Sequence, residues 1–377
     1  MERIYLDNAA ATPMDSRVLT AMMPYLTTAY GNPSSLHYFG QEARAAVQKA
    51  RRQVATCLGV VPSEIVFTSG GTEADNLAIL GYLRANFPHG GHLITSAIEH
   101  HAILRTFEAL ATKGYDVTFL PVDKTGRVRV DDVKHALRDD TVLVSIMYAN
   151  NETGMIQPIT EIGAVTKSRG IAFHVDAVQA FGYIDIQPKQ QHIDMLTICS
   201  HKIYGPKGVG ALYIRQGMEV SAEAYGGPQE HRLRAGTENV PGIVGFGEAA
   251  ALLQKERKER YDLAASYKQY IYTHLVKDNF LLHYNGTVDH ALPNILNVSV
   301  AQTDSAIALI ALDMAGVAVS AGSACEAGAV EPSHVLQAMG IGEEWLRSSI
   351  RISTGKENTA DEIKEAVERF RTVLAKM

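Results

Sequence analysis

Short runs of β-branched and other apolar residues alternate with helical stretches from about residue 60 to residue 215. This alternation is typical of βα units around a buried, mostly parallel sheet, because each crossover between parallel strands needs a helix-length connection. It predicts an α/β fold for the larger part of the chain. The expected strands are Ile65–Thr68, His92–Ser96, Val117–Val122, Val142–Tyr148, Ala172–Asp176, Met195–Cys199 and Gly210–Ile214.

A long stretch rich in Ala, Leu, Glu, Lys and Arg follows Pro241 and runs to about Leu275, which indicates a helix that connects two domains. The residues after it predict a smaller α+β unit. We therefore expect residues 1–255 to form the larger domain, and residues 256–377 to form the linker helix and a small C-terminal domain. A length of 377 residues agrees with two domains, since one domain typically has roughly 100–200 residues.

Composition excludes several classes of protein. A net charge of −6 argues against a nucleic-acid surface. The first residues lack the apolar core of a signal peptide, and the longest apolar stretch is shorter than the ~20 residues of a membrane span. We expect a cytoplasmic protein without direct nucleic-acid or membrane contacts.

The three cysteines of the chain are widely spaced. This spacing suits reduced thiols better than disulfides or a metal site, and no metal is expected.

Two expected strand ends carry groups suited to a phosphorylated aromatic ligand. After the first strand, the chain turns through two glycines into a helix, where the backbone at Gly71 and Thr72 could hold a phosphate. Asp176 closes another strand, and Gln179 follows it. An aspartate there is usually only a turn or cap residue, but it could also keep a pyridine nitrogen protonated.

Two further segments carry an amine and imidazoles. Lys202 emerges from a buried strand beside a Gly-Pro loop, so partial desolvation could make it a Schiff-base amine; Lys207 in the same loop is a rival. His100 and His101 follow a strand. An imidazole there could lie on a cofactor ring, move protons, or simply cap a helix.

Together, and in this order along the chain, these segments resemble the fold-type I pyridoxal-5'-phosphate (PLP) enzymes of the class V aminotransferase group. Within that group the chain resembles the cysteine desulfurases of nitrogen fixation and iron–sulfur assembly. The resemblance extends from Tyr5-Leu6-Asp7-Asn8-Ala9-Ala10 to Arg351-Ile352-Ser353. It implies a large domain with a mostly parallel seven-stranded sheet, a smaller α+β C-terminal domain and PLP as the cofactor.

The resemblance also implies a role for each residue of the site. These roles are Lys202 as the Schiff-base lysine, Asp176 on the pyridine nitrogen, Gln179 on the ring hydroxyl, His100 stacked on the ring, Thr72, the backbone at Gly71 and His201 on the phosphate, Asn151 beside ring and substrate, Arg351 on the substrate carboxylate, and Thr237 on the phosphate of a neighbouring subunit in a homodimer. The family often has serine at the position of Cys199, and Ser200 could replace it as a phosphate ligand only with a backbone shift.

Cys325 lies in a run of small residues, where a thiol should be accessible. Cys57, in contrast, is predicted to be a small, buried apolar side chain. The resemblance assigns the sulfur nucleophile to Cys325. The implied reaction converts L-cysteine to L-alanine and leaves a persulfide on Cys325 for a protein acceptor, either an iron–sulfur scaffold or a tRNA-thiolation enzyme. Because Glu326 would raise the pKa of this thiol, we expect deprotonation inside the site by His100 or the substrate thiolate.

Two alternatives remain open at this point. A related PLP lyase or aminotransferase would share Lys202 and Asp176 but would need no persulfide cysteine. A non-catalytic sulfur-relay or scaffold protein would need Cys325 but no reactive lysine.

Overall fold

The computed structural model of the protein describes residues 2–277, 279, 281–321 and 332–376. The expected seven-stranded sheet is present, with strand order β2-β8-β7-β6-β5-β3-β4. Every strand runs parallel to its neighbour except β8, which is antiparallel to β2 and β7. The strands are β2 (Ile65–Thr68), β3 (His92–Ser96), β4 (Asp116–Leu120), β5 (Thr141–Ser145), β6 (Ala172–Asp176), β7 (Met195–Cys199) and β8 (Gly210–Ile214). The predicted α/β fold class is therefore confirmed.

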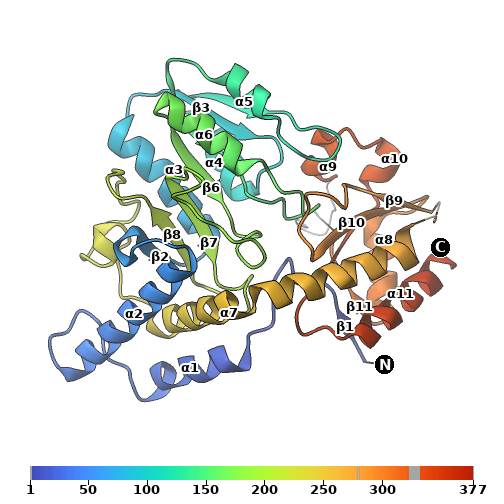
Figure 1. Cartoon of the computed structure of the whole chain (residues 1–377), viewed down its shortest axis with the longest axis horizontal. Coiled ribbons are helices and arrows are strands. Elements are labelled where there is room, and N and C mark those ends of the chain that lie inside the picture. Colours follow the sequence, from blue (N-terminus) through green and yellow to red (C-terminus); the bar gives the residue numbers. More distant parts are fainter. Residues whose placement is uncertain (1, 278, 280, 322–331, 377) are drawn as a thin grey trace.

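Helices cover both faces of this sheet, and this is why β3, β6, β7 and β8 are buried at every position. One face packs against α3 (Gly71–Asn86) and α4 (His101–Ala111). The other face packs against the remaining large helices of this part, as Figure 1 shows. They are α2 (Tyr38–Cys57), α5 (Val130–Ala136), α6 (Ile159–Arg169) and the first half of α7 (Val240–Ile271), with α1 (Ser16–Thr27) outside α7.

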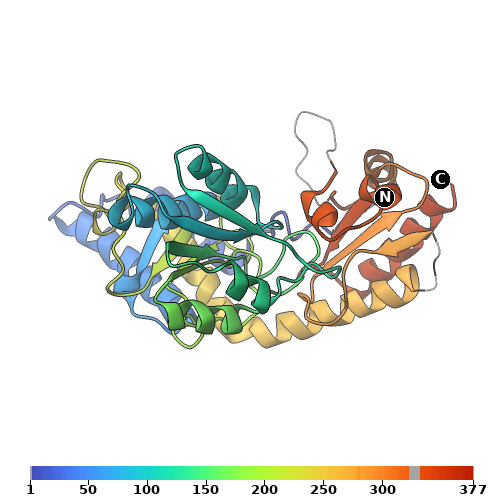
Figure 2. The same ribbon diagram turned by 90° about the horizontal axis from the view of Figure 1, so that it is seen from above.

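Helix α7 passes from the large sheet to the smaller unit along one side of the molecule (Figures 1 and 2). The expected connecting helix is therefore present. It runs without interruption through residue 255, and a π-helical turn over Tyr272–Val276 follows it. The division into domains at residue 255 stays a prediction.

The smaller unit is built on a three-stranded antiparallel sheet of order β12-β10-β9. A short parallel pair of β1 and β11 lies beside it, so that Ile4 and Leu6 at the start of the chain join the apolar core of this unit. The strands are β1 (Ile4–Tyr5), β9 (Leu282–Tyr284), β10 (Ile295–Val300), β11 (Val317–Ala318) and β12 (Ser349–Ser353). The helices are α8 (Ser305–Met314), α10 (Glu343–Leu346) and α11 (Ala360–Leu374).

One short helix of the C-terminal part packs against the edge of the large sheet, on segments that follow β3 and β5. Helix α9 (His334–Ala338) and the residues beside it contribute Val335, Leu336 and Met339 to an apolar cluster with Ile98 and Met147. Across the described ranges, no helix combines the length and the apolar character that crossing a membrane would require.

Candidate active site

A cavity of about 660 Å³ lies where the large sheet, the start of the chain and the smaller unit meet. Asp176 and Cys199, the last residues of β6 and β7, both line it. Carboxyl ends of parallel strands are the usual ligand-binding edge of such sheets. The expected site residues that line the cavity are Gly71, Thr72, His100, Asn151, Asp176, Gln179, His201, Lys202 and Arg351. The structure thus brings together groups that are separated by up to 280 positions in the chain.

The N-terminus of α3 opens into one end of this cavity. Its N-cap residue is Gly70, whose lack of a side chain leaves the first N–H groups of the helix without a side-chain cap. At Gly71 a Cβ atom would lie 2.9 Å from Val178 Cγ2, so a larger residue would close this end. Free N–H groups and the helix dipole favour a phosphate here.

Buried acids lie beside this end of the cavity. Asp176 Oδ1 accepts a hydrogen bond from Val178 N at 2.9 Å, and burial raises the pKa of this carboxyl to about 6. Asp75, one helical turn after Thr72, is also buried, and its Oδ1 has no hydrogen-bond partner among the described residues. Burial and the charge of Asp176 raise the pKa of Asp75 well above its usual value. The pair therefore favours one carboxylate and one neutral acid.

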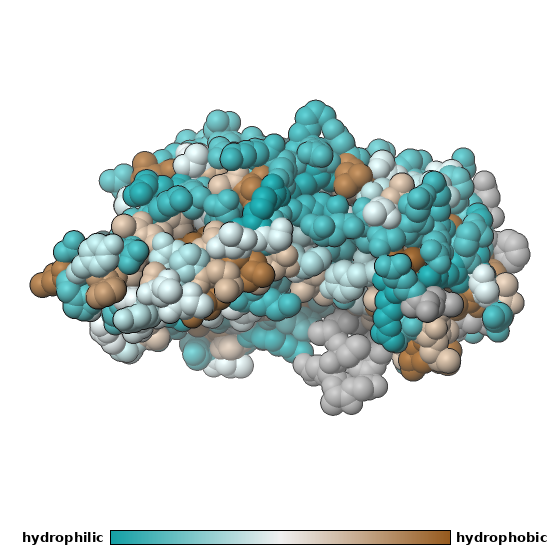
Figure 3. Space-filling view, turned by 90° about the horizontal axis from the view of Figure 1, so that it is seen from below, coloured by the Kyte–Doolittle hydropathy of each residue, from teal (hydrophilic) through white to brown (hydrophobic). Residues whose placement is uncertain are grey.

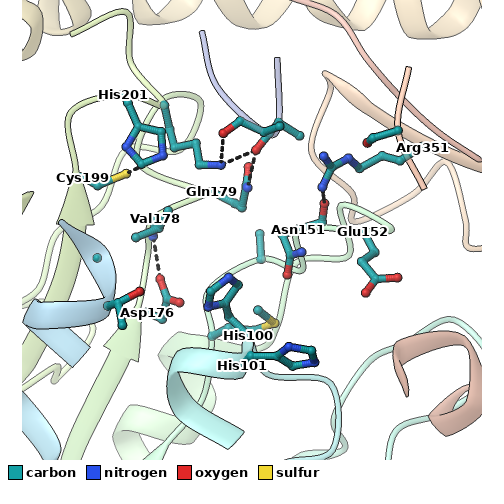
Figure 4. A pocket seen from close by; sticks show the side chains of 18 of the residues that line it. His100, His101, Asn151, Glu152, Asp176, Val178, Gln179, Cys199, His201 and Arg351 are labelled. Atoms are coloured by element: carbon teal, nitrogen blue, oxygen red, sulfur yellow. Dashed lines mark hydrogen bonds between the residues drawn. The ribbon is translucent and has the colours of Figure 1, made fainter. Parts of the chain in front are cut away.

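The amine of Lys202 faces the start of the chain. Figure 4 shows its neighbours His201 and Gln179 in the same cavity. Nζ donates hydrogen bonds to the carbonyls of Ala9 and Ala10, the latter at 2.8 Å. Gln179 Nε2 donates to the same Ala9 carbonyl at 3.0 Å. Burial lowers the pKa of Lys202, which favours the neutral, nucleophilic amine.

At the opposite end of the cavity, Arg351 on β12 presents its guanidinium. Nη1 donates to Asn151 O at 2.8 Å, and Nη2 donates to Asp7 Oδ1 at 2.9 Å. The buried Nε has no partner within the described parts of the chain. An arginine with an unused N–H beside a cavity is suited to binding a carboxylate.

Two of the expected phosphate ligands lie elsewhere. Ser200 does not line the cavity; its hydroxyl faces Gly205, where an added Cβ would lie 2.0 Å from Ser200 Oγ. Neighbouring residues of an extended chain face opposite sides, and the side toward the cavity belongs to Cys199. Cys199 Sγ lies 4.0 Å from His201 Nε2, and burial raises the pKa of this thiol to about 12. Thr237 lies in an exposed loop outside the cavity.

Cys325 lies outside the residues that the structure describes. The last described residue before it, Ala321, lines the cavity.

Three acid–base residues of the cavity were not singled out from the sequence: Asp75, Glu152 and His334. A signal existed for Asp75, because it follows Thr72 at the i, i+3 spacing that shares a helix face. Glu152 stands next to Asn151, and its buried carboxyl accepts a hydrogen bond from Ser333 Oγ at 2.5 Å. For His334, no local pattern indicates an approach to the cavity.

The cavity fits PLP, the cofactor that the sequence resemblance implies. The open N-terminus of α3 suits its phosphate, the buried carboxyl of Asp176 suits its pyridine nitrogen, and the desolvated amine of Lys202 suits its aldehyde. These three groups lie in one cavity of sufficient size for cofactor and substrate.

Comparison with known proteins places the chain in a family. The aminotransferase class-V family matches residues 4–366. A putative cysteine desulfurase, IscS 1 of Bacillus subtilis (strain 168), is 51% identical over 379 residues and covers 100% of both chains. The solved structure of a NifS-like protein superposes with a TM-score of 0.94 at 37% identity and covers 100% of both chains. That of SspA in complex with cysteine has a TM-score of 0.83 at 37% identity, covering 94% of this chain and 99% of the other. The chain therefore belongs to the class-V aminotransferase family and, within it, is a homologue of the cysteine desulfurases with PLP as its cofactor.

Proposed function

We propose that the protein is a cysteine desulfurase that converts L-cysteine to L-alanine and holds the released sulfur as a persulfide on Cys325. The observation that carries this proposal is the common cavity of Lys202, Asp176 and Arg351. The relatives named as cysteine desulfurases, and the related structure with cysteine bound, support the same substrate.

In this proposal, the phosphate of PLP is held by Gly71, Thr72 and His201, its ring by Asp176, Gln179, His100 and Asn151, and its aldehyde by Lys202. When bound, the cofactor withdraws electrons from the substrate α-carbon. Arg351 orients the substrate by its carboxylate. Lys202 Nζ takes the proton from the substrate α-carbon, a role for which its lowered pKa suits it.

The sulfur-transfer step is a displacement at sulfur. The Cys325 thiolate attacks the substrate Sγ, so that a sulfur–sulfur bond forms and the substrate Cβ–Sγ bond breaks. The electron pair of the broken bond stays with the substrate carbon, which takes up a proton and becomes the methyl group of alanine. No external oxidant is needed, because the substrate carbon is reduced as the two sulfurs are oxidised.

A homodimer is part of the proposal, with Thr237 reaching the phosphate of the second copy. Thr237 is exposed in the monomer and lies outside its own cavity. Figure 3 shows apolar side chains at the surface of the end formed by α1 and the start of α2. Exposed apolar residues there include Leu19, Met23, Leu26, Tyr30, Leu36 and Phe39. Such a surface is typical of an interface between subunits.

We place the enzyme in the cytoplasm, with a protein as its sulfur acceptor, either an iron–sulfur scaffold or a tRNA-thiolation enzyme. Support comes from the relatives called IscS.

The test is incubation of the purified protein with ³⁵S-labelled L-cysteine and no keto acid. Formation of alanine, together with label on Cys325 after tryptic digestion, is the expected result. Turnover that requires a keto acid would identify an aminotransferase, and alanine without any labelled cysteine residue would identify a lyase. A protein that binds no PLP and makes no alanine would act only as a sulfur carrier.

A further inference from the structure

A chain of buried polar side chains lies between the large sheet and α3, beside Asp176. His174 on β6 and Thr197 on β7 are fully buried, and His174 Nε2 lies 3.1 Å from Thr197 Oγ1. On its other side, His174 Nδ1 lies 2.8 Å from the hydroxyl of Ser145 on β5. Asp75 on α3 shares a side-chain hydrogen bond with Thr197, and its Oδ1 lies 3.7 Å from His174 Nε2. The interface around these groups is otherwise apolar, so their burial costs free energy unless they are hydrogen-bonded to one another.

The two carboxyls at this place, Asp75 and Asp176, differ in their partners. Asp176 accepts a hydrogen bond from Val178 N at 2.9 Å, and this bond and the nearby Lys202 both favour its ionised form. Asp75 is supported only by the Thr197 hydroxyl, since its Oδ1 makes no hydrogen bond within the described part of the chain. Two carboxylates in one buried site disfavour each other's charge. The single charge of the pair therefore belongs on Asp176, and the proton on Asp75.

The other titratable groups that face Asp75 do not change this balance. They come from β6, from β7 and from the segment after β3, and they are His174, Cys199 and Glu99. Burial lowers the pKa of His174 to about 3 and raises that of Cys199 to about 12, so both are neutral at pH 7. Burial also raises the pKa of Glu99 to about 8, which favours the neutral acid. None of the three supplies a positive charge that would stabilise an Asp75 carboxylate.

The hydrogen bonds of this chain can run in two directions, because hydroxyls and a neutral imidazole both donate and accept. With a proton on Asp75, its O–H donates to Thr197 Oγ1, the Thr197 O–H donates to His174 Nε2, and His174 Nδ1–H donates to Ser145 Oγ. With Asp75 ionised, every bond reverses, and the proton of His174 is on Nε2. The nitrogen of His174 that carries the proton therefore reports the protonation state of Asp75.

We propose that Asp75 is a positioning residue that holds the one proton of the carboxyl pair and so keeps the negative charge on Asp176, an inference that rests on the proposed place of Asp176 at the cofactor ring. Thr197, His174 and Ser145 stabilise this state, because they give the Asp75 O–H an acceptor and satisfy each donor that follows. An ionised Asp176 can keep a pyridine nitrogen protonated, whereas a neutral Asp176 cannot.

Two spectroscopic measurements locate the proton in the full-length protein at pH 7.5, without and with PLP. The infrared difference between the parent and Asp75→Asn should show the loss of a neutral carboxylic-acid band. ¹⁵N NMR of histidine-labelled protein should show His174 protonated at Nδ1 and not at Nε2, with its signals assigned by their loss in His174→Gln. Loss of a carboxylate band in Asp75→Asn, or a proton on Nε2 of His174, would overturn the inference.

Ser145→Ala tests the link from the chain to the cofactor. It removes the acceptor of His174 Nδ1–H, so the proton of His174 should move to Nε2 and the chain should reverse, which favours a proton on Asp176. We expect PLP binding to weaken by about tenfold or more, the effect of one hydrogen bond to a charged group. Thr95→Val is the matched control, because it removes a buried hydroxyl that donates to the backbone carbonyl of Ser145 but lies outside the chain.

The double variant Asp75→Asn/Ser145→Ala separates a proton effect from a packing effect. An asparagine amide cannot ionise, so the charge should stay on Asp176 and the PLP dissociation constant should stay within about twofold of the parent value. An equal loss in Thr95→Val, or a loss that persists in the double variant, would show that Ser145 acts by packing and would overturn the link. Failure of the proposed function would look different: the parent would make no alanine from cysteine, although the spectra still placed the proton on Asp75.

Discussion

Arg351 is held by Asp7, with 2.9 Å between Nη2 and Oδ1, at the end of the cavity that we assign to the substrate carboxylate. The Arg351 side chain is only 7% exposed and its Nε is unpaired in the described structure. The Asp7 carboxylate therefore already binds part of the guanidinium group that the substrate carboxylate would bind. The two carboxylates must share this group or compete for it.

The first prediction follows from that pair. Asp7→Asn should destabilise the protein without substrate by about 1–3 kcal/mol, because a buried guanidinium loses its charged partner. KM for cysteine should fall, since the competing carboxylate is gone, with little change in kcat. Thermal unfolding with and without alanine, together with steady-state kinetics, checks both effects. Arg351→Lys is the comparison: it should raise KM, and a similar rise in Asp7→Asn would disprove competition.

Lys202 and Lys207 can be told apart by covalent labelling. Lys202 is partly buried with a lowered pKa, whereas Lys207 is exposed on the same loop. Borohydride reduction of the PLP-bound protein should attach one cofactor to the peptide that contains Lys202, as measured by mass spectrometry. Lys202→Ala should lose this adduct and all turnover, and Lys207→Ala should keep both. An adduct on Lys207 in the parent protein would reverse the assignment.

The three cysteines should differ in reactivity. Burial raises the pKa of Cys57 to about 11 and that of Cys199 to about 12, so neither is a thiolate at neutral pH. Iodoacetamide at pH 7.5 should therefore modify Cys325 first, and this should stop sulfur transfer. Peptide mapping over time measures the order. Cys57→Ala and Cys199→Ala should keep desulfurase activity, the latter with weaker PLP binding if its sulfur lies beside the phosphate; loss of persulfide formation in either would contradict our assignment of Cys325.

Glu99 should make stability depend on pH. Burial raises the pKa of its carboxyl from 4.5 to about 8. Between these values the folded protein holds a proton that the unfolded chain has lost, so this carboxyl lowers stability progressively as pH rises, and the loss is complete above pH 8. Glu99→Gln cannot titrate. Its free energy of unfolding should exceed that of the parent by about 1–3 kcal/mol at pH 9 but not at pH 5.

Urea unfolding at the two pH values measures this difference. Glu108→Gln on the exposed face of α4 is the control, because its half-exposed carboxyl should contribute little. An equal effect of both variants, or none at pH 9, would show that burial does not raise the pKa of Glu99.

A buried ion pair holds the turn that precedes the Thr237 loop. Arg51 Nη2 and Glu230 Oε1 lie 2.5 Å apart, with both side chains under 5% exposed. Glu230, His231 and Arg232 all have positive φ angles, a conformation unfavourable for these residues. Arg51→Met should lower the free energy of unfolding by about 3–5 kcal/mol, because it leaves the Glu230 carboxylate buried without a charged partner. Adding Glu230→Gln to this variant should recover part of the lost stability, as measured by urea unfolding. If the double variant is less stable than Arg51→Met, the turn itself needs the Glu230 carboxylate.

Many of the strand bounds were predictable from the local pattern of apolar residues in the sequence. Strands β2, β3, β6, β7 and β8 have the expected bounds, because a fully buried strand is a continuous apolar run that is recognisable by itself. Strands β4 and β5 end earlier than expected, at Leu120 and Ser145. The apolar residues after each of them pack in connecting segments, so apolar character alone did not mark the strand ends.

The amino-acid sequence by itself also determined the main groups of the site, since Lys202, Asp176, Gly71 and His100 each stand at or just after a strand end. In a parallel sheet, the chain must bring such ends to one edge. Family resemblance was needed to choose among the reactions that this edge could support.

Tertiary structure alone decided which residues from other parts of the chain complete the cavity. Helix α9 crosses to the large sheet and delivers His334, the first strand joins the smaller unit and delivers Asp7 to Arg351, and Asp75 faces the same buried region as Asp176. Tautomers and pKa values follow from these contacts. Sequence periodicity reports which face of an element is buried, but the partner on that face is chosen by packing between residues far apart in the chain, and no local pattern encodes it.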